Sequence, residues 1–133
     1  MDIFGLREYI LDAYGVGAEF PWFDDSESMV FRHPDNRKWF AVALKVARGK
    51  LGLEGAEKSY VVNFKCDPGL SLAVRDGKAI FPAYHMNKEK WISVLLDGSV
   101  GDDVVKMLLN ESFCLTASQP KGKNAGLIDN PPV

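Results

Sequence analysis

The chain has 133 residues, of which 47 % are hydrophobic and 26 % charged, and its formal net charge at pH 7 is −2. This length suits one domain with a single core, and the composition is that of a globular protein rather than of a disordered or membrane-embedded one. No apolar run approaches the ~20 residues that cross a bilayer, and the N-terminus lacks the features of a secretory signal peptide, so we expect a cytoplasmic protein.

The first half of the chain has the pattern of one helix followed by strands. Apolar residues at helical spacing predict a helix over residues 2–14, and Gly15 is expected to end it. The aromatic segment FPWF, residues 20–23, is expected to cover one end of the core. Alternating apolar residues then predict three strands, over residues 28–33, 39–48 and 59–66, with a turn at PDNR between the first two.

The second of these strands is predicted to have two distinct faces. Its inward face is expected to consist of Phe40, Val42, Leu44 and Val46, and its outward face of Trp39, Ala41, Ala43 and Lys45. In the next strand, Asn63 and Lys65 alternate with apolar residues and are also expected to face outward. Small residues beside Lys45 and Lys65 would leave a shallow basic sheet face that a phosphate backbone can approach.

The second half of the chain is predicted to contain helices and strands in turn. Asp67–Pro68 is a strong helix start, because aspartate caps exposed amides and proline is tolerated at the first helical position. This helix is expected to run to about Arg75, with Leu70, Ala73 and Val74 on its buried side. The later expected elements are an extended segment around Pro82, a turn capped by Asn87, a strand over residues 91–97, and a helix from a Ser99–Asp102 capping box to about Phe113.

The order of the predicted elements is α-β-β-β-α-β-β-α. Strand hairpins with helices at both ends indicate a two-layer α+β fold, in which an antiparallel sheet is covered on one face by helices. We expect a single domain over residues 1–117. Residues 118–133 have the composition of a loosely ordered tail.

The residues that carry chemistry in other proteins do not form a catalytic or metal-binding pattern. Cys66 and Cys114 lie far apart in the sequence and are expected to be buried free thiols. His33 and His85 belong to no metal-ligand spacing, and the chain has neither a phosphate-binding loop nor a nucleophile motif. We therefore expect a protein that is not an enzyme and that uses no metal and no cofactor.

Charge is unevenly distributed along the chain. Residues 1–27 carry seven acids and one base, whereas residues 32–50 carry six bases and one acid. Bases on a sheet face and at a hairpin tip supply sequence-independent contacts to phosphates, so the expected partner is double-stranded DNA, bound weakly and in a salt-sensitive manner by a monomer. In the alternative interpretation these side chains only keep the surface soluble. The candidate nucleic-acid-binding residues are Arg32, Arg37, Lys38, Lys45, Lys65, Lys88 and Lys90.

The stretch AYHMNKEKW, residues 83–91, allows two interpretations. In the first it is a structural latch, in which Asn87 caps a turn and a buried His85 hydrogen-bonds the backbone. In the second, Tyr84, His85, Asn87 and Trp91 contribute to a site for a protein or small ligand, and an exposed His85 or Lys88 is required. A third hypothesis places a cation on an acidic ridge formed by Glu8, Asp12, Asp24 and Asp25.

Three blocks of the sequence resemble the MmcQ/YjbR family of small bacterial proteins: VNFKCDP, AYHMNKEKW, and a strand that ends in DGS before an acidic helix start. FPWF and WFAVALKVAR also match, so the resemblance covers residues 2–117, although Gly69 stands where the family often has a better helix former. The resemblance implies a frataxin-like (CyaY-like) α+β fold similar to double-wing DNA-binding modules, and a DNA-binding protein. The matched positions are Asn63, Lys65, Cys66, Asp67, Pro68, Tyr84, His85, Met86, Asn87, Lys88 and Trp91.

Overall fold

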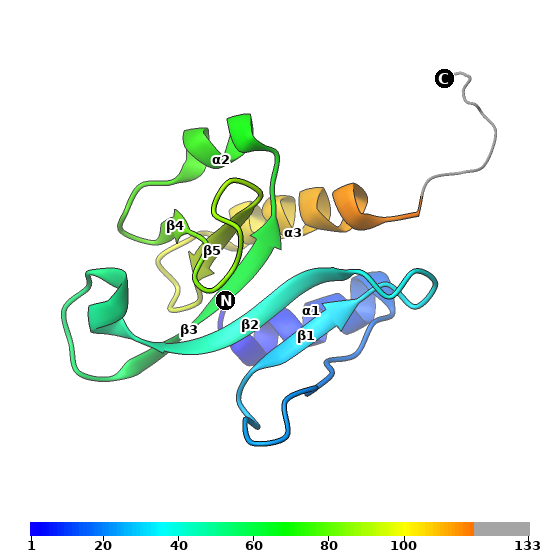
Figure 1. Cartoon of the computed structure of the whole chain (residues 1–133), viewed down its shortest axis with the longest axis horizontal. Helices are drawn as coiled ribbons and strands as arrows, with labels where there is room; N and C mark the ends of the chain where they lie inside the picture. Colours follow the sequence, from blue (N-terminus) through cyan, green and yellow to red (C-terminus); the bar gives the residue numbers. More distant parts are fainter. Residues whose placement is uncertain (119–133) are drawn as a thin grey trace.

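The computed structural model describes residues 1–118, which form a five-stranded antiparallel sheet together with helices (Figure 1). The helices are α1 (Ile3–Tyr14), α2 (Pro68–Val74) and α3 (Asp102–Thr116), with a short 3₁₀ turn, η1 (Arg48–Leu51). The strands are β1 (Met29–Arg32), β2 (Trp39–Ala47), β3 (Lys58–Lys65), β4 (Ile80–Pro82) and β5 (Trp91–Leu95). Their order across the sheet is β1-β2-β3-β5-β4. Apart from Ser118, the predicted tail lies outside the described residues.

Helices α1 and α3 lie together behind the sheet and cover one of its faces (Figure 1). Their apolar sides bury Leu6, Ile10, Leu108 and Leu109 in the core. Burial of one such side chain contributes about 1.5–3 kcal/mol, so this layer is a main source of stability. The predicted two-layer α+β fold with an antiparallel sheet is confirmed. Within the described residues, no helix has both the length and the hydropathy needed to cross a membrane.

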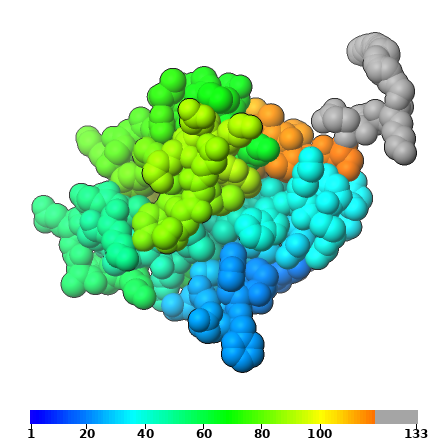
Figure 2. All heavy atoms as spheres, in the orientation of Figure 1, coloured from blue at the N-terminus to red at the C-terminus, as the bar shows by residue number. Residues whose placement is uncertain are grey.

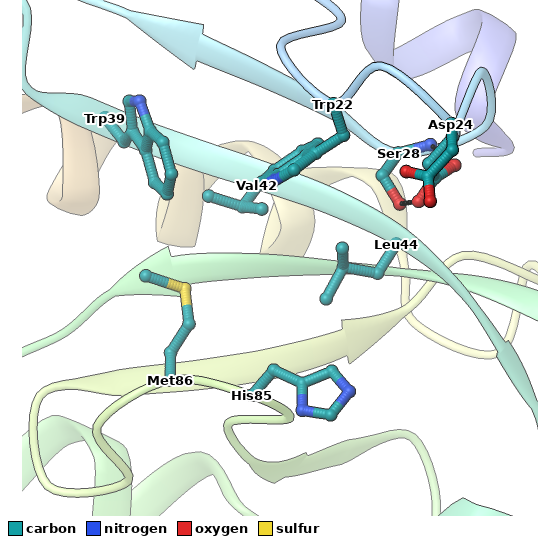
Figure 3. A pocket seen from close by; sticks show the side chains of 9 residues that line it. Trp22, Asp24, Ser28, Trp39, Val42, Leu44, His85 and Met86 are labelled. Carbon is teal, nitrogen blue, oxygen red and sulfur yellow. Dashed lines mark hydrogen bonds between the residues drawn. The ribbon is translucent and has the colours of Figure 1, made fainter.

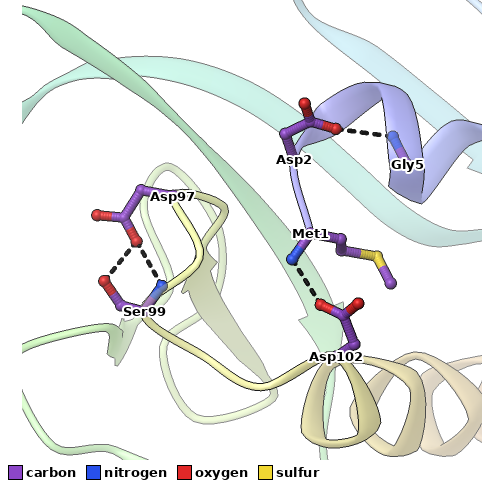
Figure 4. A network of polar contacts seen from close by, with 6 residues as sticks. All are labelled: Met1, Asp2, Gly5, Asp97, Ser99 and Asp102. Atoms are coloured by element: carbon purple, nitrogen blue, oxygen red, sulfur yellow. Dashed lines mark hydrogen bonds and ion pairs between the residues drawn. The ribbon is translucent and has the colours of Figure 1, made fainter.

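The predicted first helix is confirmed, and local contacts explain both of its ends. The Asp2 carboxylate accepts a hydrogen bond from the Gly5 amide and so caps the N-terminus. Gly15 ends α1 in the left-handed conformation, at φ 69°, which glycine adopts without strain. The amino group of Met1 lies 2.7 Å from the Asp102 carboxylate in the first turn of α3, and this ion pair joins the starts of the two helices (Figure 4).

The capping box predicted for the last helix is wrong. Helix α3 begins after Gly101, and no described side chain caps its first turn. The hydroxyl and the amide of Ser99 instead both donate to the Asp97 carboxylate (Figure 4). The Ser99 amide is therefore not available to the Asp102 carboxylate, which pairs instead with the amino group of Met1.

The predicted faces of β2 are partly wrong, because the strand carries a bulge. Arg32 pairs with Trp39 and Phe31 pairs with Ala41, which leaves Phe40 as the extra residue. An extra residue shifts the alternation of side chains by one position. The faces on the two sides of Phe40 therefore cannot be read as one continuous pattern.

Beyond the bulge, the alanines that were predicted to face outward lie in the core. Ala41 pairs with Phe64 and Ala43 pairs with Val62, and all four are fully buried on the helix-covered face. Val42, predicted to face the helices, points to the opposite face of the sheet. The strand therefore has two buried faces, and the apolar alternation in its sequence does not distinguish which face meets the helices.

The FPWF segment does not cover the core. Phe20 and Trp22 are partly exposed and Phe23 is fully exposed. The cause is a pair of backbone hydrogen bonds, each 2.9 Å long, between Glu19 and Val30. These bonds hold the chain along the outer edge of β1, so the aromatic side chains that follow lie outside the helix–sheet core.

The helix start at Asp67–Pro68 is confirmed, and the buried side predicted for this helix is correct in part. The Asp67 carboxylate accepts hydrogen bonds from the Gly69 and Leu70 amides. Leu70 and Val74 are partly buried and pack against the core, as predicted. Ala73 is exposed instead, and Ser71 is the one fully buried residue of α2. Helix α2 lies at one end of the sheet instead of on the face that α1 and α3 cover (Figure 1).

One carboxylate holds the turn that leads from α2 to β4. Asp76 accepts hydrogen bonds of 2.8–3.0 Å from the amides of Lys78, Ala79 and Ile80. These donors, the Ala79 amide foremost, lower the pKa of Asp76 from 3.8 to about 2. The ionised carboxylate therefore stabilises the fold above pH 3.8, and this contribution is lost as the pH falls toward about 2.

We expect Asp76→Asn to remove this acid-range dependence, because asparagine keeps an acceptor oxygen but carries no charge. The variant should be less stable than the wild type at neutral pH, and the two free energies of unfolding should converge near pH ~2. Urea denaturation across this pH range measures both, with Asp103→Asn at an exposed position as the control. If the free energies of unfolding of Asp76→Asn and the wild type differed by the same amount at neutral and acidic pH, the role given to the ionised Asp76 carboxylate would be contradicted.

Candidate functional site

The face of the sheet opposite the helices is covered by loops. Figure 2 shows the yellow-green segment that includes residues 83–90 in front of the sheet, with the blue segment of residues 20–28 projecting below it. Loops that a rigid sheet supports are common places for binding residues. The contacts that position these two loops therefore decide whether a site exists here.

Two buried polar side chains fasten the 83–90 loop to the sheet. Asn63 on β3 is fully buried, and its side chain donates to the Tyr84 carbonyl at 2.9 Å. Ser93, its neighbour on β5, donates its hydroxyl proton to the Asn63 side-chain oxygen and accepts a 2.8 Å hydrogen bond from the Tyr84 amide. Both backbone groups of Tyr84 are thus paired with the sheet, which fixes the loop over it.

His85, the next residue, is exposed, and the latch interpretation that required it to be buried is wrong. The backbone of Tyr84 holds the loop instead. His85 has φ 62°, in the left-handed region that few residues other than glycine adopt. Strain of this kind is often found at functional sites, where the surrounding structure imposes it.

The turn that follows His85 is capped as predicted. The Asn87 side chain accepts a 2.8 Å hydrogen bond from the Glu89 amide. Lys88 ties the turn back to the start of the loop, since its ammonium group donates to the Ala83 carbonyl at 2.8 Å. The loop is therefore closed at both ends, and His85 lies between the two fastenings.

We expect His85→Gly to leave the free energy of unfolding unchanged or to raise it by about 1 kcal/mol, because glycine adopts positive φ without strain. Arg37→Gly, at the other described non-glycine residue with positive φ (64°), is the matched control. Urea denaturation of both variants measures the effect. A clear loss of stability in His85→Gly alone would give the imidazole a structural role and contradict this account.

A pocket of about 300 Å³, here called the sheet-face pocket, opens between the 83–90 loop and β2 (Figure 3). Its upper wall holds Trp22 and Trp39, whose rings meet edge to face with centres 6.0 Å apart. Met86 points from the loop toward this wall. Apolar and aromatic walls with a few polar groups are typical of ligand sites. The other residues that line the pocket are Asp24, Asp25, Ser28, Val42, Leu44 and His85.

One end of the sheet-face pocket is acidic. Asp24 is exposed there, and Asp25 accepts hydrogen bonds from the hydroxyl and amide of Ser28 and from the Glu27 amide. These bonds, that of the Ser28 hydroxyl foremost, hold the pKa of Asp25 below its ordinary value, so the carboxylate stays ionised at neutral pH. Among the described residues that line the pocket, none is a lysine or an arginine.

The predicted basic sheet face does not form. Lys45 pairs across the sheet with Tyr60, whereas Lys65 pairs with Trp91. Alternate residues of β3 point to opposite faces, so Tyr60 and Lys65, and with them Lys45 and Lys65, lie on opposite sides of the sheet. The prediction failed because alternation assigns faces within one strand but does not say which faces of two strands coincide.

Three of the predicted DNA-contacting cations form ion pairs with acids from the N-terminal segment. The side chains of Arg32 and Arg37 lie 3.2 and 3.3 Å from the Glu19 carboxylate. The ammonium group of Lys45 lies 3.1 Å from the Glu27 carboxylate. The acidic and basic segments of the sequence therefore neutralise each other in the fold, and the uneven charge along the chain does not become an uneven surface at these positions.

Other cations gather in a groove between α2 and the 87–90 turn. Arg75, Lys88 and Lys90 line this groove of about 540 Å³, here called the cation groove. The Cys66 amide donates to the Lys90 carbonyl at 2.8 Å, which places Lys65 at the end of β3 beside the same turn. Arg75 was not among the predicted residues, because its place near the end of a short helix gives no sign of the neighbouring turn.

Two further predicted residues lie outside both cavities. Lys38 is exposed in the turn between β1 and β2. Trp91 is half-buried on β5 and lines neither the sheet-face pocket nor the cation groove. Neither residue therefore contributes to these sites.

The thiols and the buried histidine are not arranged for catalysis. Cys66 is buried and free, and burial foremost raises the pKa of its thiol, which opposes formation of a nucleophilic thiolate. Cys114 is also free but exposed, contrary to prediction. His33 is buried against the Phe113 ring, with its Nε2 atom 2.9 Å from the Thr116 hydroxyl. This histidine has a structural hydrogen bond and no access to a substrate.

The acidic ridge does not form a cation site. Asp25 directs its carboxylate to the amides of Glu27 and Ser28, and Asp24 lies with it at the acidic end of the sheet-face pocket. Among residues 1–118, no group of three or more histidine, cysteine or acidic side chains is close enough to hold a metal ion.

The two tryptophans that line the sheet-face pocket, Trp22 and Trp39, were not among the predicted binding residues, whereas Asp24 and Asp25 had been predicted only as part of a cation ridge. Trp22 had been assigned to the core, and Trp39 to an exposed face without a covering loop. The usable signal was an aromatic residue at an outward strand position together with an aromatic segment followed by two acids. Only the tertiary structure shows that these segments face the AYHM loop.

Comparison with known proteins gives the chain a family. The sequence profile of the YjbR family matches residues 11–115. The uncharacterised protein YyaQ of Bacillus subtilis (strain 168) is 36 % identical over 115 residues, which cover 86 % of this chain and 95 % of that protein. The uncharacterised protein YbdF of Escherichia coli O157:H7 is 38 % identical over 55 residues, 41 % of this chain and 45 % of that protein.

Solved structures share the fold. A crystal structure of a Pseudomonas syringae protein, 37 % identical, superposes with a TM-score of 0.85 over 88 % of this chain and 100 % of that one. A Deinococcus radiodurans protein, 24 % identical, gives a TM-score of 0.67 over 92 % of this chain and 83 % of that one, and supports the fold alone. With the family profile and the relatives taken together, the chain belongs to the YjbR family.

Proposed function

We propose that this YjbR-family protein is a non-enzymatic binding module of the cytoplasm, and that it binds a small ligand as a monomer in the sheet-face pocket. The observation that supports this most is the loop that covers the pocket. Asn63 and Ser93 use buried hydrogen bonds to hold a strained, exposed His85 at its rim. Strain and buried polar groups lower stability unless they are compensated, so their use here favours a functional role.

The chemistry of the described residues supports a binding role rather than catalysis. The sheet-face pocket holds neither of the two cysteines, and His85 is its one histidine. Cys66 is a buried free thiol with a raised pKa. Free thiols persist in a reducing compartment, which supports the proposed cytoplasmic location. Indole, thioether and imidazole side chains supply contact area and orientation without a nucleophile.

A blocked pocket tests the proposal. Ligand-observed NMR with a mixture of small fragments should give hits for the wild type and lose them for Met86→Trp, whose larger side chain fills the pocket. Met107→Trp on the exposed side of α3 is the matched control and should keep every hit. Hits that survive in Met86→Trp, or the absence of any hit with the wild type, would overturn the proposed site.

A second candidate function is weak binding of duplex DNA through the cation groove. Arg75, Lys88 and Lys90 line one groove beside Lys65. This grouping favours the cation groove as a DNA-binding surface over the seven cations that were predicted from the sequence. Phosphate contacts of this kind release counterions, so the affinity should fall steeply with salt. Arg32, Arg37 and Lys45 are paired with Glu19 and Glu27, so we do not expect them to contact DNA.

Fluorescence anisotropy of a labelled duplex of about 20 bp, at about 50 and 200 mM salt, tests this candidate. The wild type should bind in a saturable and salt-sensitive manner. Replacement of Lys65, Arg75 and Lys90 by alanine should weaken binding and flatten the salt dependence, whereas Lys38→Ala should not. If the anisotropy of the duplex did not change with added wild-type protein at either salt concentration, DNA binding through the cation groove would be contradicted.

A further inference from the structure

The sheet-face pocket has a charge that narrows its choice of ligand. Its charged walls are the carboxylates of Asp24 and Asp25, and it has no lysine or arginine among its described lining residues. Lys45, the nearest cation on β2 by sequence, is engaged by Glu27 at 3.1 Å. Lys58 is the cation that acts on Asp25, and it lies outside the pocket lining. The pocket therefore attracts a positive group and repels an anion.

The upper wall of the pocket presents aromatic surface to the same ligand. Trp22 and Trp39 lie along this wall with an interplanar angle of 69° between their rings (Figure 3). Tryptophan is the side chain that binds cations best through its ring face. The polarisable thioether of Met86 faces this wall from the loop and adapts to methyl groups.

These features distinguish between classes of cation. A metal ion needs several oxygen ligands, and Asp25 already accepts three hydrogen bonds from residues 27 and 28. A guanidinium brings five N–H donors that would need acceptors, which the apolar walls lack. A methylated ammonium has few or no N–H donors, so apolar walls and one exposed carboxylate suffice. Its small size also suits a volume of about 300 Å³.

We propose that the sheet-face pocket binds a small molecule that carries a quaternary or highly methylated ammonium group. The methyl groups lie against Trp22, Trp39 and Met86, and the positive charge lies toward Asp24. This inference rests on the proposed function, since it names the class of ligand for the same pocket. His85 borders the site from the loop side and helps to exclude water.

Choline and its uncharged carbon isostere, dimethylbutanol, test the inference, because the two have nearly the same shape. The readout is the indole N–H signal of each tryptophan in proton–nitrogen NMR spectra. The chain has three tryptophans, and Trp91 lies outside the pocket, so it is an internal control. Choline should shift the Trp22 and Trp39 signals in a saturable way, with a Kd about tenfold below that of dimethylbutanol.

A matched pair of variants separates charge from shape. Asp24→Asn should weaken choline binding several-fold and leave dimethylbutanol binding unchanged, whereas Asp103→Asn, at an exposed acid on α3, should change neither. Equal affinity for the two compounds, no effect of Asp24→Asn, or unmoved Trp22 and Trp39 signals would overturn the inference. If other fragments still bind in the pocket, the charge argument alone has failed; if no compound of any charge binds there, the proposed function has failed as well.

Discussion

Replacement of Ser112 by alanine is expected to lower the free energy of unfolding by about 2–4 kcal/mol, because two buried backbone groups lose their partner. Ser112 on α3 is fully buried, and its hydroxyl donates to the Phe40 carbonyl at 2.6 Å. The same oxygen accepts a 2.8 Å hydrogen bond from the Lys65 amide. The hydroxyl therefore bridges β2 and β3 directly beyond the last pair of their ladder, Ala41 with Phe64.

Urea denaturation of Ser112→Ala measures the loss. Cys114→Ala is the matched control on the same helix, and since Cys114 is exposed, a change within about 0.5 kcal/mol is expected. If Ser112→Ala changed stability as little as the control, the bridge between the strands would not contribute to the fold as described.

Asn63→Ala is expected to have a comparable effect, about 2–3 kcal/mol, since it leaves the Tyr84 carbonyl and the Ser93 hydroxyl without their partner. It should also release the 83–90 loop. The Tyr84 and His85 amides should then exchange hydrogen with solvent faster relative to global unfolding. Fragment binding in the sheet-face pocket should be lost, because the loop that carries Met86 is no longer fixed.

Denaturation, hydrogen exchange and fragment binding measured on one Asn63→Ala sample test the three effects together. The control is Asn110→Ala, where the exposed side chain accepts one hydrogen bond from the Tyr14 hydroxyl at 3.1 Å. Asn110→Ala should leave hydrogen exchange in the 83–90 loop and fragment binding in the sheet-face pocket unchanged. A destabilised Asn63→Ala that still binds every fragment would separate the loop from the site and contradict the role given to the fastening.

The fold was largely predictable because its signals are local. Helical spacing with Asp2 and Gly15 at the ends specifies α1, and the pair Asp67–Pro68 specifies the start of α2. The errors lie where tertiary contacts decide. The bulge at Phe40 depends on how β1 and β2 pair, and the position of Phe23 depends on the bridge between Glu19 and Val30, so neither could be predicted from the pattern of one segment.

The candidate site was only partly predictable. The AYHM segment identified the loop, and Asn87 was correctly expected to cap its turn. The pocket itself joins that loop to Trp22 and Trp39 across the sheet, and no periodicity in the sequence brings these segments together. For the basic residues the sequence pattern was misleading. It placed Lys45 and Lys65 on one face of the sheet, but they lie on opposite faces.

The central claim is that the sheet-face pocket is the binding site of this YjbR-family protein. It is tested most directly by the indole N–H signals of the wild type during titration with fragment hits. The account predicts that the Trp22 and Trp39 signals move together along one saturable curve while the Trp91 signal stays in place. Hits that move Trp91, or that shift only residues of the cation groove, would place binding elsewhere and contradict the claim.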